Sequence, residues 1–351
     1  MAVTLIATVV ALVLGHMAPS LAASVRQYGW YGDWLRGLDA RFGDGSFWRG
    51  RWGIAMALVP PLLVIGLFQL ALDGPLFGLA GLLFGIMVLF YAWGPRDLDV
   101  DVEAIAAADD AQGRRAAAAR LWPDDRTPSL DGPSLVEAVF RNALRRWFGV
   151  LFWFLLLGPF GALLYRLAVL SVEGEAARAL PAETASGART LLAVLEWPVA
   201  QLMALSTALV GNVDTALGAW RDAGGASLSL DNRFLAAVAR ASVRSELAEE
   251  VADYADESGL AAPPAIVVLG ELPELRDAMS LVWRSLLVWL AVLARFVIAG
   301  FVSRSRSHGG PRPASVRLAD LHPGRQRTRE RKARKQVEAI HGAERKRGID
   351  P

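Results

Sequence analysis

The residues best suited to bind a ligand stand around one long apolar stretch, residues 148–172. They are Glu137, Asn142, Arg145, Arg146, Tyr165 and Arg166. Guanidinium groups bind carboxylates and phosphates, and carboxyl, amide and phenol groups can orient a bound molecule. The stretch is also interrupted at Gly158-Pro159, and a helix break inside lipid exposes backbone groups that a ligand could use. The sequence therefore predicts a ligand-binding site built from these residues, without a catalytic set.

Arg166 has two interpretations that the sequence leaves open. It could anchor the outer end of the apolar stretch at the lipid headgroups, as long basic side chains often do. It could instead be a buried group that binds an anion. In that case Asn142, Arg145 and Arg146 would lie at the membrane entrance, and Tyr165 would lie beyond the break with Arg166.

Several kinds of chemistry are excluded or disfavoured. The chain has no Cys, which excludes a disulfide framework, a thiolate metal site and a Cys nucleophile. Its four His are scattered, and the sequence lacks a phosphate-binding loop, a nucleophile elbow and a zinc-protease motif. The acidic run from Asp97 to Glu103 could hold a divalent cation, but acids at the positive end of a helix dipole are favoured. We expect no metal and no cofactor, and a non-enzymatic role is favoured over an enzymatic one.

The elements that position these residues belong to a membrane protein. Hydrophobic residues make up 54% of the 351, with 12 Trp and a mean hydropathy of +0.33. This is too apolar for an ordinary soluble protein. We expect an all-α, polytopic integral membrane protein with amphipathic helices and about five membrane segments, each matched to a hydrocarbon layer of ~30 Å. The segments are residues 2–17, 53–72, 75–93, 148–172 and 281–302, and the fourth is broken or re-entrant at Gly158-Pro159.

The distribution of charge predicts an orientation. Residues 18–52 hold five Arg and residues 94–147 hold eight, while the tip between the second and third segments holds none. By the positive-inside rule both Arg-bearing loops are cytoplasmic, and the N-terminus lies outside. Residues 173–278 carry a net charge of −9 and are expected outside. A re-entrant fourth segment would reverse the side of the second half of the chain.

The membrane domain is expected to end at residue 302, and residues 303–351 form a basic tail with a net charge of +9. We expect this tail to be disordered and cytoplasmic. Its run RQRTRERKARK, residues 325–335, has a composition typical of phosphate-binding segments but no aromatic residue to stack on bases. Anionic lipid headgroups are therefore favoured as its partner over nucleic acid. The oligomeric state is left open.

Two apolar segments have alternative placements. Residues 190–211 are long enough to cross the membrane, but they contain Glu196 and Pro198, so a helix lying in the interface or packed on the bundle is favoured. Residues 2–17 could be a secretory signal, although the basic residues that precede such a signal are missing.

One stretch carries a family resemblance: LFWFLLLGPFGALLYRLAVL, residues 151–170. The other matching elements are Asp97-Leu98, the LEWPVAQL segment from Leu195, Gly211 and Trp220. Together they resemble the membrane family that contains the AmpE regulator of β-lactamase induction and its relative CobD/CbiB, the adenosylcobinamide-phosphate synthase. The resemblance extends over roughly residues 41–301. The AmpE branch implies a bacterial inner-membrane modulator that acts with the cytosolic amidase AmpD in peptidoglycan recycling.

The synthase branch is disfavoured by its polar positions. Glu137 and Asn142 match its IES-x-AEN-xx-DG pattern, but four further polar positions are occupied by Arg141, Arg145, Val169 and Val172. Arg and Val cannot replace the acidic and amide groups that an amide-forming synthase would use for metal or substrate. A non-enzymatic regulator is therefore favoured. The alternatives are a diverged CobD/CbiB-like synthase and a small-molecule transporter, which should show two broken spans rather than one.

Overall fold

The computed structural model describes residues 2–17, 24–72, 74, 78–94, 97–122, 127–227, 229–258, 272–309, 331–332 and 334–335. Within these ranges every regular element is a helix, which confirms the all-α prediction. The chain divides into two compact units, residues 1–300 and 301–351. Most of the predicted basic tail, and Asp73 and Pro75 at the tip of the predicted hairpin, lie outside the described residues.

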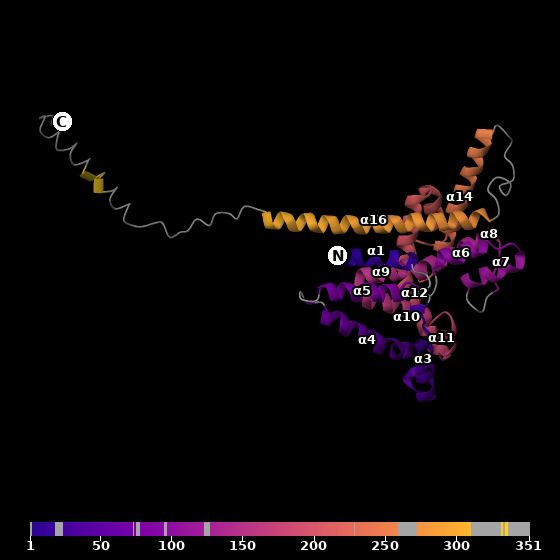
Figure 1. The fold of residues 1–351 in the computed structure, drawn as a ribbon, viewed down its shortest axis with the longest axis horizontal. Coiled ribbons are helices and arrows are strands. Elements are labelled where there is room, and N and C mark those ends of the chain that lie inside the picture. The colour runs from indigo at the N-terminus through magenta and orange to yellow at the C-terminus, as the bar shows by residue number, and fades with distance from the viewer. Residues whose placement is uncertain are drawn as a thin grey trace, which may run out of the picture. The chain divides into compact units, whose positions relative to one another are not determined.

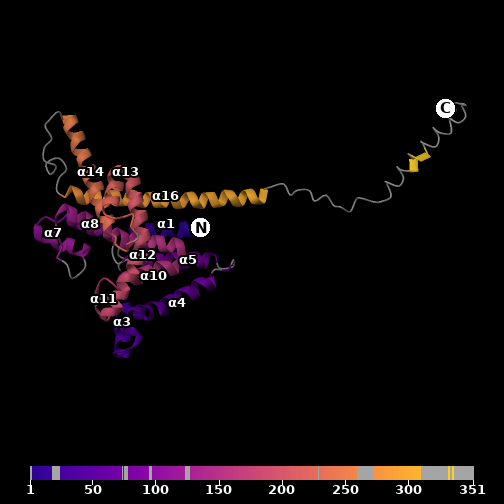
Figure 2. The same cartoon turned by 180° about the vertical axis from the view of Figure 1, so that it is seen from behind.

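The helices of the first half are α1 (Ala2–Met17), α3 (Gly29–Arg41), η1 (Phe47–Arg49), η2 (Arg51–Gly53), α4 (Ile54–Leu72), α5 (Gly78–Ala92), α6 (Leu98–Ala106), α7 (Ala111–Ala118) and η4 (Ala119–Leu121). Those of the second half are α8 (Gly132–Ala143), η5 (Leu144–Phe148), α9 (Gly149–Leu157), α10 (Pro159–Leu170), α11 (Glu175–Arg178), α12 (Ala182–Val210), α13 (Val213–Asp222), α14 (Arg233–Ser258) and α16 (Pro273–Gly309). Figure 1 shows α6, α7 and α8 gathered near the end of the first unit where α16 begins, and Figure 2 shows the same arrangement from behind.

Three helical stretches among the described residues are long and apolar enough to cross a membrane: Arg51–Leu72, Ala182–Val210 and Pro273–Arg295. The first and third agree with two predicted segments. Shorter apolar helices cover Leu5–Gly15, Gly78–Ala92 and Pro159–Leu170. The number of five segments stays a prediction, because three of the expected segments form shorter or interrupted helices.

Contacts near the ends of α1 and α5 define one end of the bundle. The Arg26 guanidinium donates to the Phe90 carbonyl at 2.9 Å, and the Tyr28 hydroxyl donates to the Tyr91 carbonyl at 2.6 Å. The chain therefore leaves α1 and α5 at the same end of the bundle, which we call the base. The two Arg-bearing loops, which follow these two helices, accordingly begin at the same end.

The predicted break at Gly158-Pro159 is confirmed. Gly158 has φ +69°, a backbone conformation that favours glycine, and it separates α9 from α10. The two short helices form an antiparallel hairpin with unusually close backbones. A Cβ on Gly149 would lie 2.0 Å from the Tyr165 ring, and one on Gly161 would lie 2.1 Å from the Trp153 carbonyl oxygen. Only glycine fits at these two positions, as in other closely packed membrane helices.

An amide from α4 satisfies the backbone groups that the break exposes. Gln69 donates to the Leu157 carbonyl at 3.1 Å and accepts from the Phe160 amide N–H at 3.0 Å. The last carbonyls and first N–H groups of helices have no partner within the helix, and in lipid no water replaces one. Gln69 therefore stabilises the turn between α9 and α10, and it occupies groups that the sequence suggested for a ligand.

Side-chain contacts fix where α8 and α12 begin. Ser134 and Glu137 have the spacing of a capping box, but α8 begins earlier, and its N-cap Asp131 accepts from the Ser134 amide N–H at 3.0 Å. Hydrogen bonds from Ser129 and Ser134 also lower the pKa of Asp131. Residues 173–186 contain α11 and the first turn of α12. Tertiary contacts extend α12: Thr184 donates to the Trp48 carbonyl.

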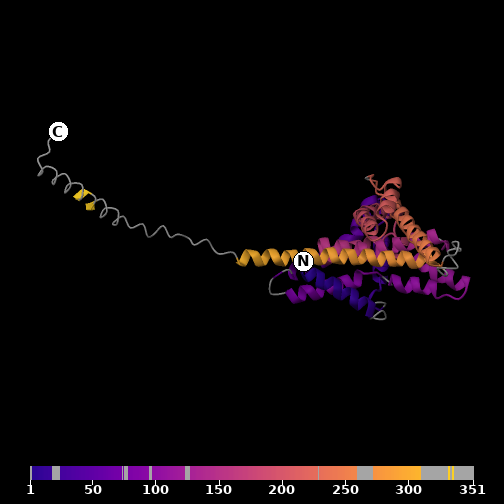
Figure 3. The same cartoon turned by 90° about the horizontal axis from the view of Figure 1, so that it is seen from above.

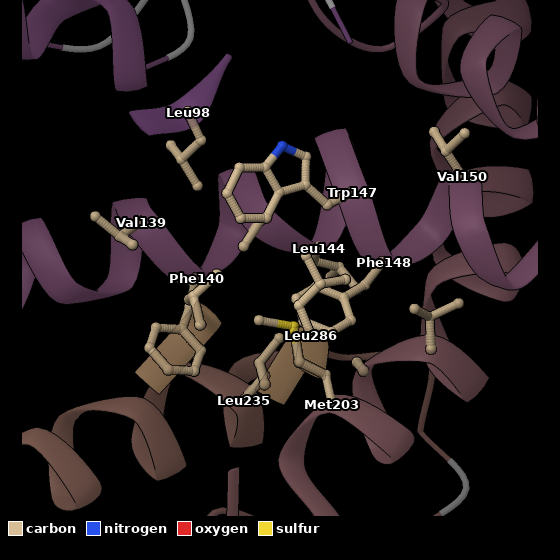
Figure 4. Close-up of a cluster of buried hydrophobic side chains, with 14 of the residues drawn as sticks. Leu98, Val139, Phe140, Leu144, Trp147, Phe148, Val150, Met203, Leu235 and Leu286 are labelled. Atoms are coloured by element: carbon tan, nitrogen blue, oxygen red, sulfur yellow. The ribbon is translucent and has the colours of Figure 1, made fainter. Parts of the chain in front are cut away.

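The core is built around the continuous helical run of α8, η5 and α9. Phe140, Trp147 and Phe148 on this run are at most 2% exposed. Figure 4 shows side chains from α6, α12, α14 and α16 gathered around it, among them Leu98 and Leu286. The Trp147 and Trp283 ring centroids are 5.2 Å apart, and those of Phe152 and Trp289 are 6.4 Å apart. α16 therefore runs beside this helix in the same direction. The view from above shows α16 as one long straight helix (Figure 3).

The path of α12 brings it into contact with several helices along its length. Its first turns contact η1 and η2, since Thr190 accepts from Arg51 at 3.1 Å. Its middle residue Glu196 pairs with Arg145 at the start of α9, and its last turns meet α16, where Trp289 donates to Ser206 at 3.2 Å. A helix that touches the beginnings of α4 and α9 in succession runs across the base.

Candidate functional site

The candidate site residues lie on or near a short π-helix, η5, between α8 and α9. A π-turn inserts an extra residue into a helix, and such turns are frequent at functional sites. It turns the consecutive residues Arg145 and Arg146 toward different acidic partners. The structure brings these two arginines together with Tyr165 and Arg166 of α10.

Arg145 lies at the centre of a buried ionic cluster. Its Nε donates to Glu196 Oε1 at 2.6 Å, and its Nη1 donates to Glu173. Asn232 donates to the second oxygen of Glu196 at 3.2 Å. Burial alone would lower the pKa of Arg145, but Glu196 and Glu173 outweigh this effect and raise it above its ordinary value. The guanidinium is therefore permanently charged and its carboxylate partners come from the chain itself.

The Arg145–Glu173 pair also closes the α9–α10 hairpin. Arg145 immediately precedes α9 and Glu173 follows α10, so both ends of the predicted fourth segment meet at the base. A helix that crossed a bilayer would separate its flanking residues by about 30 Å. The segment thus enters and leaves the bundle at the same end.

Arg146 forms a second buried pair. Its Nη1 lies 2.6 Å from Asp101 Oδ2 on α6, and its Nη2 donates to the Arg120 carbonyl at 3.1 Å. Asp101 is 1% exposed. It stands in the first turn of α6 with Asp99, and Asp99 accepts from Trp283 at 2.8 Å. The acids predicted at the start of this helix therefore bind an arginine and an indole of the same chain.

Arg166 is 1% exposed and caps the end of α5. Its Nε donates to the Ala92 carbonyl at 2.6 Å and its Nη2 donates to the Arg145 carbonyl at 3.4 Å. With Arg26 on Phe90 and Tyr28 on Tyr91, three consecutive carbonyls at this helix end receive side-chain donors. Burial raises the pKa of Tyr28, which keeps its hydroxyl protonated as a donor. A cation also interacts favourably with the negative end of the helix dipole.

Tyr165 is fully buried against Gly149, and its hydroxyl donates to the Leu144 carbonyl at 3.3 Å. This carbonyl belongs to the π-helix, where the ordinary helical hydrogen bonds are interrupted. Tyr165 and Arg166 together therefore bond two successive carbonyls of η5, those of Leu144 and Arg145. Their placement stabilises the π-turn.

Two of the predicted residues lie elsewhere. Asn142 donates to the carbonyls of Leu121 and Ala138, both at 2.8 Å, and so joins η4 to α8. Glu137 accepts from Arg240 of α14 at 3.0 Å. Both stand on α8, on the far side of η5 from the hairpin, and neither belongs to the ionic cluster around Arg145.

The cluster contains three arginines and three carboxylates. Arg145 pairs with Glu173 and Glu196, Arg146 pairs with Asp101, and Arg166 bonds backbone carbonyls. Removing one member of a buried pair leaves an uncompensated charge, whereas the complete set is satisfied. The arrangement can hold the base of the hairpin, α6 and α12 in fixed register. Its charged groups bind one another or backbone carbonyls.

A family model described as "Regulatory signalling modulator protein AmpE" matches residues 51–269. This match covers more than half of the chain. The chain belongs to the AmpE family. No curated protein and no solved structure matches it. The relation to the CobD/CbiB synthases, expected from the sequence, stays a prediction.

The AmpE match extends from η2 to the residues after α14, and it includes the hairpin and the ionic cluster. It leaves out α1, α3, η1, the whole of α16 and the tail. The features that the family model spans are therefore the base of the bundle and the helices packed on it.

Sequence reasoning missed the acidic and amide partners of the predicted site. These are Gln69, Asp101, Glu173, Glu196 and Asn232. A signal existed for Gln69 and Glu196, because Gln69 is the lone polar side chain of its apolar run and Glu196 is the lone charged side chain of residues 190–211, and such residues usually have a partner. No local signal connects Glu173 or Asn232 to the cluster, since their partners are distant in sequence.

Proposed function

We propose that this AmpE-family protein is a non-enzymatic regulatory modulator in the bacterial inner membrane, acting in β-lactamase induction and peptidoglycan recycling. An AmpD-type cytosolic amidase is the functional partner that the family relationship suggests. The observation that carries this proposal is the AmpE match over residues 51–269. The role as a signalling modulator is the family's own description, and the pathway and partner are proposed here.

The ionic cluster supports the non-enzymatic part of the proposal. General acid–base catalysis needs a titratable group within hydrogen-bond reach of a substrate. Glu173 and Glu196 are instead bonded to Arg145, and Asp101 is bonded to Arg146. The carboxylates of the cluster therefore have structural partners, and the same contacts define a rigid base against which another protein could dock.

A topology follows from the hairpin. Because α9 and α10 begin and end at the base, residues 173–258 share a side with the two Arg-bearing loops, which the positive-inside rule makes cytoplasmic. α12 then lies across the cytoplasmic interface, as the sequence favoured. α16 leaves the base in the direction of α9, so the tail emerges outside, with the N-terminus.

In this topology the tail is outside, whereas its own positive charge predicts that it is cytoplasmic. The positive-inside rule weighs basic residues near membrane ends, and residues 303–322 hold four Arg, against thirteen in the two loops. The loops therefore decide the orientation. The tail can still bind anionic headgroups, in the outer leaflet.

Reporter fusions at Gly174, Ser227 and the C-terminus test the topology. We expect cytoplasmic readings at Gly174 and Ser227 and an external reading at the C-terminus. An external reading at Ser227 would show that residues 148–172 cross the membrane, and it would overturn the re-entrant hairpin.

Deletion of the gene, followed by a β-lactamase induction assay, tests the function. The proposal expects altered induction that is restored by the intact gene, because a modulator changes the response without making a product. Normal induction together with a cobalamin requirement would contradict it in favour of a synthase.

A further inference from the structure

A pocket outside the ionic cluster lies between α8, α14 and the start of α16. Its volume is about 120 Å³. Its apolar lining is formed by Pro133, Val136, Val243 and Leu247, and its charged lining by Arg240, Arg244 and Glu274. The three helices come from distant parts of the chain, so only the folded protein forms the pocket. The proposed function does not use it.

One of the three charged side chains that line this pocket has an ionic partner among the described residues, and two do not. Arg240 is held by Glu137 at 3.0 Å. Arg244 and Glu274 form no ion pair or side-chain hydrogen bond with any residue that the structure describes, including each other. Two opposite charges therefore line one pocket without neutralising one another. A ligand that carries both a carboxylate and an ammonium group would satisfy both.

A glycine at the start of α8 leaves room for the Glu274 side chain beside the pocket. Gly132 is the first residue of α8, and a Cβ at this position would lie 2.6 Å from the Glu274 carboxyl group. The absence of a side chain lets the carboxylate lie against the positive end of α8. A carboxylate is a group that binds an ammonium group.

The size of the pocket limits the ligand. Pockets for drug-sized molecules have volumes of about 300–1,000 Å³. This one suits a much smaller molecule, and its aliphatic lining favours short alkyl groups over a sugar or a base. Arg244 offers a planar pair of donors that matches a carboxylate.

We propose that the pocket binds a small zwitterion, such as a free amino acid or dipeptide with short alkyl side chains. Arg244 binds the carboxylate, Glu274 binds the ammonium group, and the aliphatic side chains of Val136, Val243 and Leu247 contact the alkyl part. The proposal stands apart from the role in β-lactamase induction, because binding is measured on the purified protein alone.

The test uses the full-length protein in lipid nanodiscs and titrates it with alanyl-alanine by calorimetry. Two blocked probes, N-acetyl-alanyl-alanine and alanyl-alanine amide, each lack one charge. We expect each blocked probe to bind about tenfold or more weakly than the free dipeptide, since each loses a charge-assisted hydrogen bond. Equal binding of the three probes, or no binding of the free dipeptide at millimolar concentration, would overturn the proposal.

Two single variants test which charged group of the ligand each of Arg244 and Glu274 binds. Arg244→Gln should weaken alanyl-alanine about tenfold and leave the amide probe unchanged, because that probe has no carboxylate to lose. Glu274→Gln should weaken alanyl-alanine similarly and leave the acetylated probe unchanged. Glu249→Gln, on the exposed surface of α14, is the control and should bind like the parent protein. If Arg244→Gln weakened all three probes equally, Arg244 would not bind the carboxylate.

Discussion

The cluster around Arg145 and the pocket around Arg244 both contain arginines and carboxylates. In the cluster these charges have partners within the chain, since the arginines and carboxylates are buried or half-buried and are bonded to each other or to backbone carbonyls. In the pocket, Arg244 and Glu274 do not have ionic partners among the described residues. Buried charges need an opposite charge or a hydrogen-bond partner within the fold, whereas partly solvated charges are stabilised by water and remain available to bind a ligand. The comparison separates charges that stabilise this fold from charges that are available for recognition.

The largest effect is expected from Glu196→Leu. This change leaves Arg145 with only Glu173 and deprives Asn232 of its acceptor. Removing one partner of a buried pair should reduce the free energy of unfolding by about 3 kcal/mol. Thermal unfolding in detergent and the amount of protein in the membrane measure the loss.

The double variant Glu196→Leu/Arg145→Met provides the control for that experiment. It should recover much of the lost stability, because a buried pair can often be replaced by apolar residues. A single variant as stable as the parent would mean that the cluster is solvated and that its contrast with the pocket is wrong.

Arg166→Ala should have the next largest effect. It removes two donors from carbonyls at the end of α5 and in η5, for a loss of about 2 kcal/mol. We expect lower membrane levels but normal regulation per molecule. Lost regulation at a normal membrane level would instead assign Arg166 to a ligand site, and normal behaviour in both respects would contradict its role as a cap.

Gln69→Leu should cost about 1–2 kcal/mol, because the Leu157 carbonyl and the Phe160 amide lose their side-chain partner. Unfolding measurements of the variant in nanodiscs can detect this loss. Leu70→Ala, an exposed position on the same helix, is a suitable control and should change stability little. Equal stabilities of the two variants would show that Gln69 does not support the break.

The smallest effect on stability is expected from Arg244→Gln. Since no residue that the structure describes pairs with Arg244, its loss should change the free energy of unfolding by no more than about 0.5 kcal/mol. The same unfolding measurement as for Glu196→Leu allows a direct comparison. A loss as large as that of Glu196→Leu would place Arg244 in a structural network and remove the distinction between the two regions.

The sequence predicted features that depend on local pattern. Apolar runs indicated the helices near residues 53–72 and 281–302, and Gly158-Pro159 indicated the break, because glycine and proline act on the backbone where they stand. The run from Asp97 to Glu103 correctly indicated acids in the first turn of a helix. The starts of α8 and α12 depend on the Asp131 cap and on the contact of Thr184 with Trp48.

The partners of the candidate residues could not be predicted in the same way. Arg145 is 51 residues from Glu196, and Arg146 is 45 residues from Asp101. No periodicity relates residues so far apart, because their distance depends on how helices pack. The sequence grouped Glu137 with Arg145 and Tyr165 by proximity along the chain, but the fold directs Glu137 to Arg240 instead.

By itself the sequence indicated that the chain is surrounded by lipid, that its fold is all-α, and that the fourth apolar segment is broken at Gly158-Pro159. These follow from local composition, since a long apolar run favours lipid and only a helix satisfies its own backbone there. Tertiary structure alone decided that both ends of residues 148–172 meet at the base, where Arg145 pairs with Glu173. It also decided which charges are paired, because buried pairing depends on contacts between distant helices that no local pattern encodes.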